Sequence, residues 1–134
     1  MTDRIAVRAL RGATTITAGE QPMAEAGRIA TLELLGAMLE QNDLTADDIV
    51  SALFTLTPDI HGAAPARAAR EAGWHEVAML TASEAPSEHS LPQCIRVLLH
   101  IETTRPRSAL RHQYLRGAGV LRPDLLSRAD HEAH

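Results

Sequence analysis

Two periods of apolar and polar residues run along the chain and predict both strands and helices. Residues 4–14 alternate apolar with charged or small side chains up to Gly12, which is typical of a strand. From Pro22 to Gln41 the apolar residues recur every three or four positions, as on one face of a helix, and Pro22 suits its first turn. The chain is therefore predicted to open with a strand followed by an amphipathic helix.

Further along, apolar runs of strand length alternate with loops and one short helix. Pro65 near its first turn and Gly73 just past its end frame that helix. The predicted strands are residues 49–57, 77–81, 94–102 and 111–122, the last of them weakened by Gly117 and Gly119. This order, β-α-β-α-β-β-β, predicts an α+β fold with a mixed sheet and helices on one face.

Length and composition predict one globular domain over residues 1–134, with a flexible tail at 123–134. No segment approaches the roughly 20 apolar residues of a membrane span, and the N-terminus lacks the apolar run of a signal peptide. Cys94 is the single cysteine, so no disulfide can form within the chain. We therefore expect a cytoplasmic protein.

The charge pattern argues against nucleic acid and membranes as partners. The net charge is −4 and aromatic residues make up only 2% of the chain, too few for a base-stacking platform. All thirteen basic residues are arginine, which excludes Schiff-base lysine chemistry and a lysine-bearing phosphate loop. Any site for an anion must therefore be built from arginines.

Metal and nucleophilic chemistry have little support in the sequence. The seven histidines are scattered and do not form a ligand motif. Cys94 begins an apolar strand, where a buried and inert thiol is the usual outcome. Neither a GxSxG motif nor a glycine-rich phosphate loop occurs. From these residues alone we expect no metal site.

Arg96 is the unusual residue, because it lies within the apolar run CIRVLLHIE and cannot lose its charge. It needs a negative partner, either a carboxylate of the protein or a ligand. Four other arginines lie at or near ends of predicted elements and face the same alternatives, with Glu71, Asp59 and Asp124 as candidate partners. They are Arg11, Arg67, Arg70 and Arg122. Together with Glu84 and Tyr114 as polar partners, they could hold a carboxylate-bearing ligand.

The order of motifs resembles that of the AroH-class, Bacillus-type chorismate mutases. The opening segment RALRGATT is followed by TPDIH and PARAAR, then by Gly73-Trp74, Glu84, CIRV, RHxYL and VLRPD, in the family's order and near its spacings. The resemblance covers about residues 4–125. It implies an isomerase that converts chorismate to prephenate by a Claisen rearrangement, in the biosynthesis of phenylalanine and tyrosine. It also implies a homotrimeric pseudo-barrel with active sites between subunits, and no metal or cofactor.

The resemblance also assigns roles to individual residues. Arg96 would contact the ether oxygen and the enolpyruvyl carboxylate, with Arg11 and Tyr114 also reaching that carboxylate. Glu84 would accept a hydrogen bond from the ring hydroxyl. The remaining substrate-binding positions implied are Arg67, Arg70 and Arg122 near the ring carboxylate, and Leu121, Leu80, Thr81 and Ala64 along the pocket.

Some positions depart from the Bacillus-type pattern. Thr81 replaces a cysteine, Ala64 replaces a phenylalanine, and the loop at residues 85–92 differs almost throughout. A second class of protein also remains open, because small trimers with clefts between subunits serve as carboxylate-binding regulators or as imine deaminases. Neither of these would account for Glu84, Arg96 and Tyr114 occurring together in the family's register.

Overall fold

The computed structural model describes residues 4–17, 19 and 22–121. The elements are β1 (Ala6–Thr15), α1 (Met23–Gln41), β2 (Ile49–Leu56), α2 (Pro65–Glu71), β3 (Ala78–Ser83), β4 (Cys94–Thr103) and β5 (Gln113–Tyr114), with 3₁₀ helices at Ala46–Asp48, Arg107–Ala109 and Arg116–Leu121. Arg122 and the tail at 123–134 lie outside the described residues. The assignment of residues 1–134 to one domain stays a prediction.

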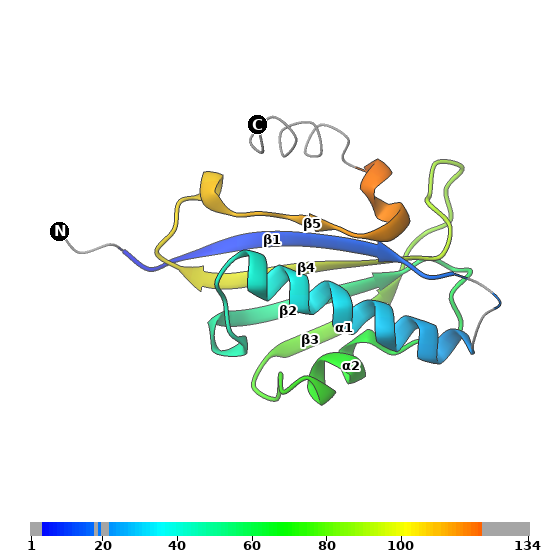
Figure 1. Cartoon of the computed structure of the whole chain (residues 1–134), viewed down its shortest axis with the longest axis horizontal. Helices are drawn as coiled ribbons and strands as arrows, with labels where there is room; N and C mark the ends of the chain where they lie inside the picture. The colour runs from blue at the N-terminus through cyan, green and yellow to red at the C-terminus, as the bar shows by residue number, and fades with distance from the viewer. Residues whose placement is uncertain (1–3, 18, 20–21, 122–134) are drawn as a thin grey trace.

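The strands form one mixed sheet in the order β3-β2-β4-β1-β5 (Figure 1). β4 runs antiparallel to both of its neighbours, β1 and β2. The two outer strands are parallel to the strands beside them, β3 to β2 and β5 to β1. The mixed sheet expected from the element order is therefore confirmed, and its central strand is the one that carries Arg96.

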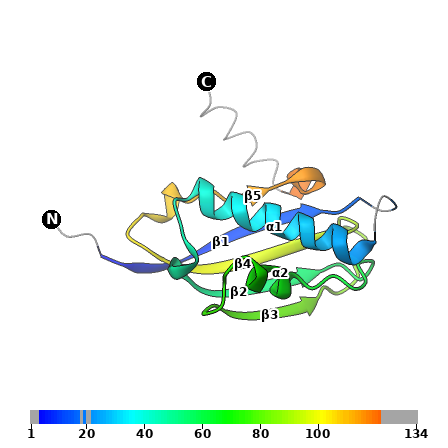
Figure 2. The ribbon, with the colours of Figure 1, turned by 60° about the horizontal axis from the view of Figure 1, so that its bottom comes forward.

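Both helices pack on the same face of this sheet (Figure 2). In β4, Ile95, Val97 and Leu99 are buried, whereas the alternate residues Arg96 and Leu98 are only partly buried. Successive side chains of a strand point to opposite faces, so the strand divides into a core side and an open side. The α+β fold with helices on one face is confirmed. No helix in the described part of the chain is long and apolar enough to cross a membrane.

Gly12 allows α1 to lie close against β1. A Cβ atom at this position would lie 2.5 Å from Met38 Sδ and 3.2 Å from Leu34 Cδ1, both of them buried core side chains of α1. Any larger residue would push the helix away from the sheet or force Met38 to repack. The glycine of the RGATT segment thus serves the packing of the core on the helix side of the sheet.

Asn42 joins the end of α1 to the segment that precedes β5. Its side-chain Nδ2 donates to the backbone oxygens of Met38 at 2.8 Å and Arg111 at 3.0 Å. Its Oδ1 accepts the backbone N–H of Arg111 at 2.8 Å. This buried amide therefore has partners for both of its polar atoms, and it holds the chain two residues before β5 begins.

The predicted strand at residues 111–122 is wrong over most of its length. Only Gln113–Tyr114 pair with β1 as a strand, and Arg116–Leu121 form a 3₁₀ helix. Arg116 adopts a φ of 52°, which an extended strand cannot contain. Gly117 then approaches β1 closely enough for its N–H to donate to Thr15 Oγ1 at 3.1 Å, and a Cβ there would lie 3.0 Å from the same oxygen. The turn depends on this contact with a residue far away in sequence.

Candidate functional site

The open face of the sheet contains a cavity of about 240 Å³ near its centre. Side chains from β1, β2, β4 and β5, from the residue that follows β3, and from the last 3₁₀ helix surround it. The lining residues are Arg11, Gly12, Ala13, Leu53, Thr55, Glu84, Arg96, Val97, Leu98, Tyr114 and Leu121. Five residues that were expected to contact a ligand are thus brought together: Arg11, Glu84, Arg96, Tyr114 and Leu121.

Arg96 lies on the open side of β4, directly opposite Ala13 of β1 and Thr55 of β2. Its Nε lies 3.5 Å from Glu84 Oε1, and 34% of its side chain is exposed. Nε is buried and makes no hydrogen bond with the described residues. Its contact with Glu84 is an ion pair and not a hydrogen bond. The charge is thus partly balanced, while donor capacity remains at the cavity.

Glu84 is held at the point where the chain leaves the sheet. Its backbone N–H donates to the oxygen of Leu56 at 2.8 Å, one residue after β3 ends. Its side chain, 19% exposed, has one carboxylate oxygen 3.5 Å from Arg96. The other oxygen, Oε2, accepts the hydroxyl hydrogen of Thr55 at 3.1 Å. The carboxylate therefore stands at the cavity between a cation and a neutral donor.

Arg11 and Tyr114 reach the cavity from neighbouring strands. The backbone N–H of Arg11 donates to His112 Nδ1 at 3.0 Å, just before the short pairing of β1 with β5. Tyr114 pairs with Ala13 in that register. The Tyr114 hydroxyl is buried and makes no hydrogen bond with the described residues. A buried donor without a partner is costly, which is consistent with a group whose partner is a ligand or water.

Cys94 begins the same strand as Arg96 but does not line the cavity. It is fully buried, and burial raises the pKa of its thiol, although the nearby Arg96 opposes that shift. A thiol with a raised pKa carries little thiolate near neutral pH. This environment agrees with the expectation that Cys94 is a packing residue.

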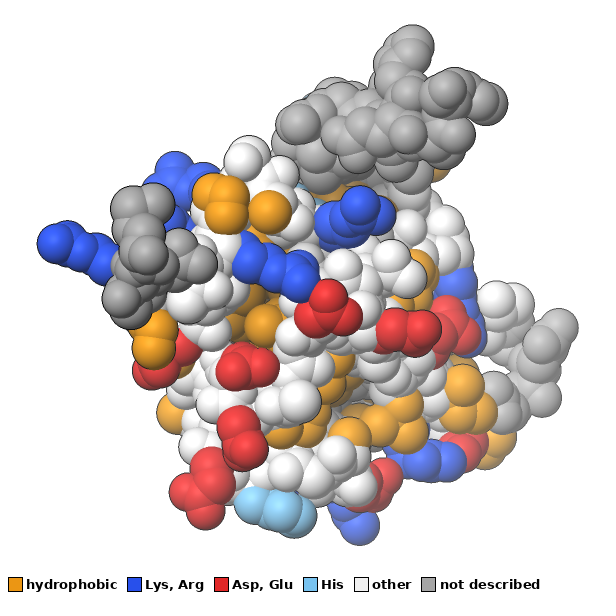
Figure 3. All heavy atoms as spheres, turned by 60° about the vertical axis from the view of Figure 1, so that its left-hand side comes forward, with side chains coloured by type: hydrophobic (Ala, Val, Ile, Leu, Met, Phe, Trp, Pro, Cys, Tyr) orange, Lys and Arg blue, Asp and Glu red, His pale blue; other side chains and the backbone are white. Residues whose placement is uncertain are grey.

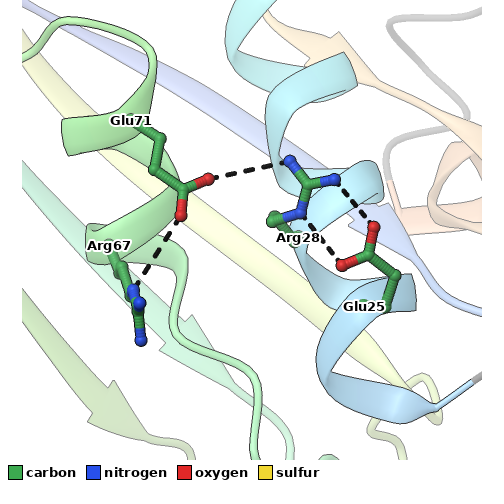
Figure 4. Close-up of polar contacts among 4 residues, drawn as sticks. All are labelled: Glu25, Arg28, Arg67 and Glu71. Atoms are coloured by element: carbon green, nitrogen blue, oxygen red, sulfur yellow. Dashed lines mark hydrogen bonds and ion pairs between the residues drawn. The ribbon is translucent and has the colours of Figure 1, made fainter.

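Five expected site residues do not reach this cavity within one chain: Ala64, Arg67, Arg70, Leu80 and Thr81. Arg67 and Arg70 lie on α2, which covers the opposite face of the sheet. Arg67 Nε is 3.8 Å from Glu71 Oε1, and Glu71 also lies 3.6 Å from Arg28 of α1 (Figure 4). Arg67 was expected to pair either with a protein carboxylate or with a ligand, and in the single chain it forms an ion pair with Glu71. Such exposed pairs add little stability.

The edge strand β3 presents two of the three remaining wall positions, Leu80 and Thr81, to solvent. Leu80 is 73% exposed, and Thr81 is exposed as well. Leu80 pairs with Leu53, a residue that lines the cavity, so the two belong to the same face of the sheet. A large exposed leucine on an edge strand is unusual in a soluble protein unless another surface covers it.

A second hollow of about 320 Å³ lies at the end of the sheet where β1 begins and β4 ends. Asn42, Asp43, Glu102 and Arg105 are among its lining residues, and Arg105 is paired with Asp43 at 2.7 Å. Viewed from that side, the surface shows acidic, basic and apolar side chains (Figure 3). None of the expected site residues lines this hollow, so the smaller cavity is the candidate site.

The comparison with known families agrees with this geometry. The model of the family chorismate mutase type I matches residues 7–125. The chain belongs to this family. That stretch contains all the described residues that line the cavity, and the resemblance noted in the motifs is confirmed.

Named chorismate mutases are similar over most of the chain. A chorismate mutase AroH of Thermus thermophilus is 46% identical over 122 residues, which are 90% of this chain and 98% of that protein. The AroH of Bacillus subtilis is 38% identical over 120 residues, 89% of this chain and 92% of that protein. A solved chorismate mutase from Clostridium thermocellum superposes with a TM-score of 0.79 at 41% identity, over 84% of this chain and 98% of that one.

Sequence reasoning missed one polar residue that lines the candidate cavity, Thr55. A signal was available, because Ser51, Leu53 and Thr55 alternate with buried residues and so share the open side of β2. Nothing in the sequence, however, placed Thr55 beside Glu84, which lies 29 positions further on.

Proposed function

We propose that this chain catalyses the Claisen rearrangement of chorismate to prephenate, an isomerase reaction in phenylalanine and tyrosine biosynthesis, and that it does so in the cytoplasm. The observation that carries the proposal is the pairing of Arg96 with Glu84 across the cavity, at 3.5 Å, next to the buried and unpartnered hydroxyl of Tyr114. A cation, an anion and a neutral donor within one small cavity suit a polar dianion that redistributes charge as it reacts.

The reaction breaks a C–O bond while a C–C bond forms, and it requires neither proton transfer nor a covalent intermediate. The enzyme's task is then to hold a compact conformer and to stabilise the charge that develops. Negative charge grows on the ether oxygen, and Arg96 is proposed to donate to that oxygen and to the enolpyruvyl carboxylate. An interaction that strengthens as charge develops lowers the barrier instead of merely tightening binding.

The other residues of the cavity then have complementary roles. Arg11 and Tyr114, on adjacent strands, are proposed to bind the enolpyruvyl carboxylate. Glu84 is proposed to accept a hydrogen bond from the ring hydroxyl and to balance positive character on the ring. Leu121 is proposed to pack against the ring. No metal or cofactor has a role in this mechanism.

Charge balance supports a site completed by a second copy of the chain. Arg11 and Arg96 supply two positive charges to the cavity and Glu84 one negative charge, which does not neutralise a dianionic substrate. Arg67, Arg70 and Arg122 are proposed to supply the missing charge near the ring carboxylate, with Ala64, Leu80 and Thr81 as walls. Since the first two lie across the sheet from the cavity, they would come from a neighbouring subunit of a homotrimer.

The apolar side chains on the outside of the chain support the same assembly. Val7, Leu53 and Leu80 are 57%, 39% and 73% exposed. The strand register places their side chains on the open face of the sheet. Covering them in a trimer would bury apolar area that a monomer leaves in water.

The proposal is tested by the loss of chorismate absorbance on adding purified, EDTA-treated protein, with prephenate identified as the product. A regulator that only binds carboxylates would leave the absorbance flat while the ligand still raised its melting temperature. An imine deaminase would instead release ammonia from an imine and leave chorismate unchanged.

A further inference from the structure

Thr55 makes a contact that the roles proposed above do not use. Its hydroxyl donates to Glu84 Oε2 at 3.1 Å, and it stands directly opposite Arg96 in the antiparallel pair β2–β4. Arg96 in turn faces the other oxygen, Oε1, at 3.5 Å. The two carboxylate oxygens therefore have different partners, and all three side chains line the cavity.

The contact joins a stiff donor to a flexible acceptor. Thr55 lies within β2, one residue before the strand ends, and its branched Cβ restricts the direction of its hydroxyl. Glu84 lies just beyond β3 and reaches the cavity through three rotatable side-chain bonds. Its backbone is anchored to Leu56 at 2.8 Å, but that bond does not orient the carboxylate. The hydrogen bond from the Thr55 hydroxyl to Oε2 orients the carboxylate.

We propose that Thr55 is a positioning residue for the chorismate mutase reaction. By occupying Oε2 of Glu84, it leaves Oε1 for the ring hydroxyl of the substrate. It also keeps the carboxylate from turning both oxygens toward Arg96. Such a two-point ion pair is the strongest contact available to those groups, and it would occupy the donors that Arg96 needs for the ether oxygen.

The inference rests on the proposed function and is tested through it. Thr55→Val keeps the shape of the side chain and its fit to a strand but removes the donor. We expect turnover to fall roughly tenfold, with the Michaelis constant changing less than about threefold, because the hydrogen bond acts on a charged group. Thr55→Ser retains the hydroxyl and should stay within about threefold of wild type. Thr55→Ala is a second donor-free variant should Thr55→Val not fold.

A matched control lies on the same strand. The hydroxyl of Ser51 is 3.1 Å from Nδ1 of His100 and does not contact Glu84, and Ser51 does not line the cavity. Ser51→Ala removes a part-buried hydroxyl of β2 just as Thr55→Ala does, and it should leave turnover unchanged. An equal loss in Ser51→Ala would show that β2 is merely sensitive to lost hydroxyls and would overturn the inference.

The Glu84→Ala background separates positioning from direct contact with the substrate. If Thr55 acts through Glu84, adding Thr55→Val to Glu84→Ala costs nothing further. An undiminished loss there would mean that Thr55 acts on the substrate itself, and the positioning role would be wrong. Wild-type protein that fails to convert chorismate would refute the proposed function, whereas active wild type with an equally active Thr55→Val would refute only this inference.

Discussion

Arg96 and Glu84 face each other across the cavity, with Arg96 Nε 3.5 Å from Glu84 Oε1, although they come from β4 and from the residue after β3. The separation is short enough for charge compensation, yet Nε makes no hydrogen bond with the described residues. A two-point ion pair with Glu84 would occupy N–H donors of Arg96 and leave fewer of them to bind a ligand. The longer contact balances the charge of Arg96 but leaves its Nε–H available to a ligand.

Replacing Arg96 with lysine should test this availability. Lysine keeps the charge but loses the planar fork, so it cannot span the ether oxygen and a carboxylate together. We expect a folded protein whose turnover falls at least about a hundredfold, since one donor to a developing oxyanion contributes roughly 10²–10³ in rate. The Michaelis constant should change less, as measured by steady-state kinetics on chorismate.

The matched control for this substitution is Arg105→Lys. Arg105 also forms an ion pair, at 2.7 Å with Asp43, but it lies at the hollow at the end of the sheet. Its replacement should leave turnover unchanged. Near-wild-type turnover in a folded Arg96→Lys protein would mean that Arg96 is a structural ion pair.

Arg67→Ala should raise the Michaelis constant with a smaller effect on turnover. The side chain is proposed to bind the ring carboxylate, which does not gain charge during the reaction. Arg28→Ala is the control, because Arg28 contacts the same Glu71 from α1 at 3.6 Å (Figure 4). A similar rise in both variants would attribute the effect to the disturbed ion pairs around Glu71 and not to substrate binding.

Subunit mixing should reveal whether sites are shared between chains. Arg96→Lys and Arg70→Ala damage opposite faces of the sheet, so a mixed trimer contains sites with both wild-type residues. Co-expression of the two impaired variants should therefore restore part of the activity. Light scattering should give the mass of a trimer, and an active monomer at assay concentration would rule out the shared site.

Turnover at saturating chorismate should be nearly flat from about pH 6 to pH 9. The chemical step transfers no proton, arginine stays charged throughout, and an ordinary glutamate ionises near 4.3. The measurement is the rate at saturating substrate in buffers of constant ionic strength. A steep bell-shaped profile would show that a proton transfer limits the reaction and that the mechanism is incomplete.

Stability should depend on pH through Asp59. A hydrogen bond from the Thr57 hydroxyl, helped by the backbone N–H of Gln93, lowers the pKa of this carboxyl in spite of some burial. A group with a depressed pKa in the folded state stabilises the fold above its unfolded pKa, and the contribution is lost as pH falls through the folded pKa. Asp59→Asn should therefore lower the melting temperature at pH 7.

At a pH below the ordinary aspartate pKa of about 3.9, the same substitution should have a smaller effect than at pH 7, because the contribution of the charged carboxyl is lost as the pH falls toward its lowered folded-state pKa. Asp47→Asn, at an exposed acid of the first 3₁₀ helix, is the control and should shift the melting temperature less at pH 7. Equal shifts at both values of pH would mean that the Asp59 charge does not contribute.

The sequence by itself determined most of the elements and the family. Apolar spacing is a local property, so the period of 3.6 residues in α1 and the alternation in β1 could be read directly. Arg96 could be recognised as a candidate site residue because a permanent charge among branched apolar neighbours is costly without a partner. The motif order pointed to chorismate mutases, and the family comparison confirmed it.

The tertiary structure decided what depends on contacts between distant residues. The segment after Tyr114 is apolar enough for a strand, but the turn at Arg116 and the approach of Gly117 to Thr15 fold it into a 3₁₀ helix. The contact of Thr55 with Glu84 likewise follows from the register of β2 with β3, and the separation of Arg67 from the cavity follows from the layer in which α2 packs. Such relations arise from strand order and packing, which the spacing of residues along the chain does not encode.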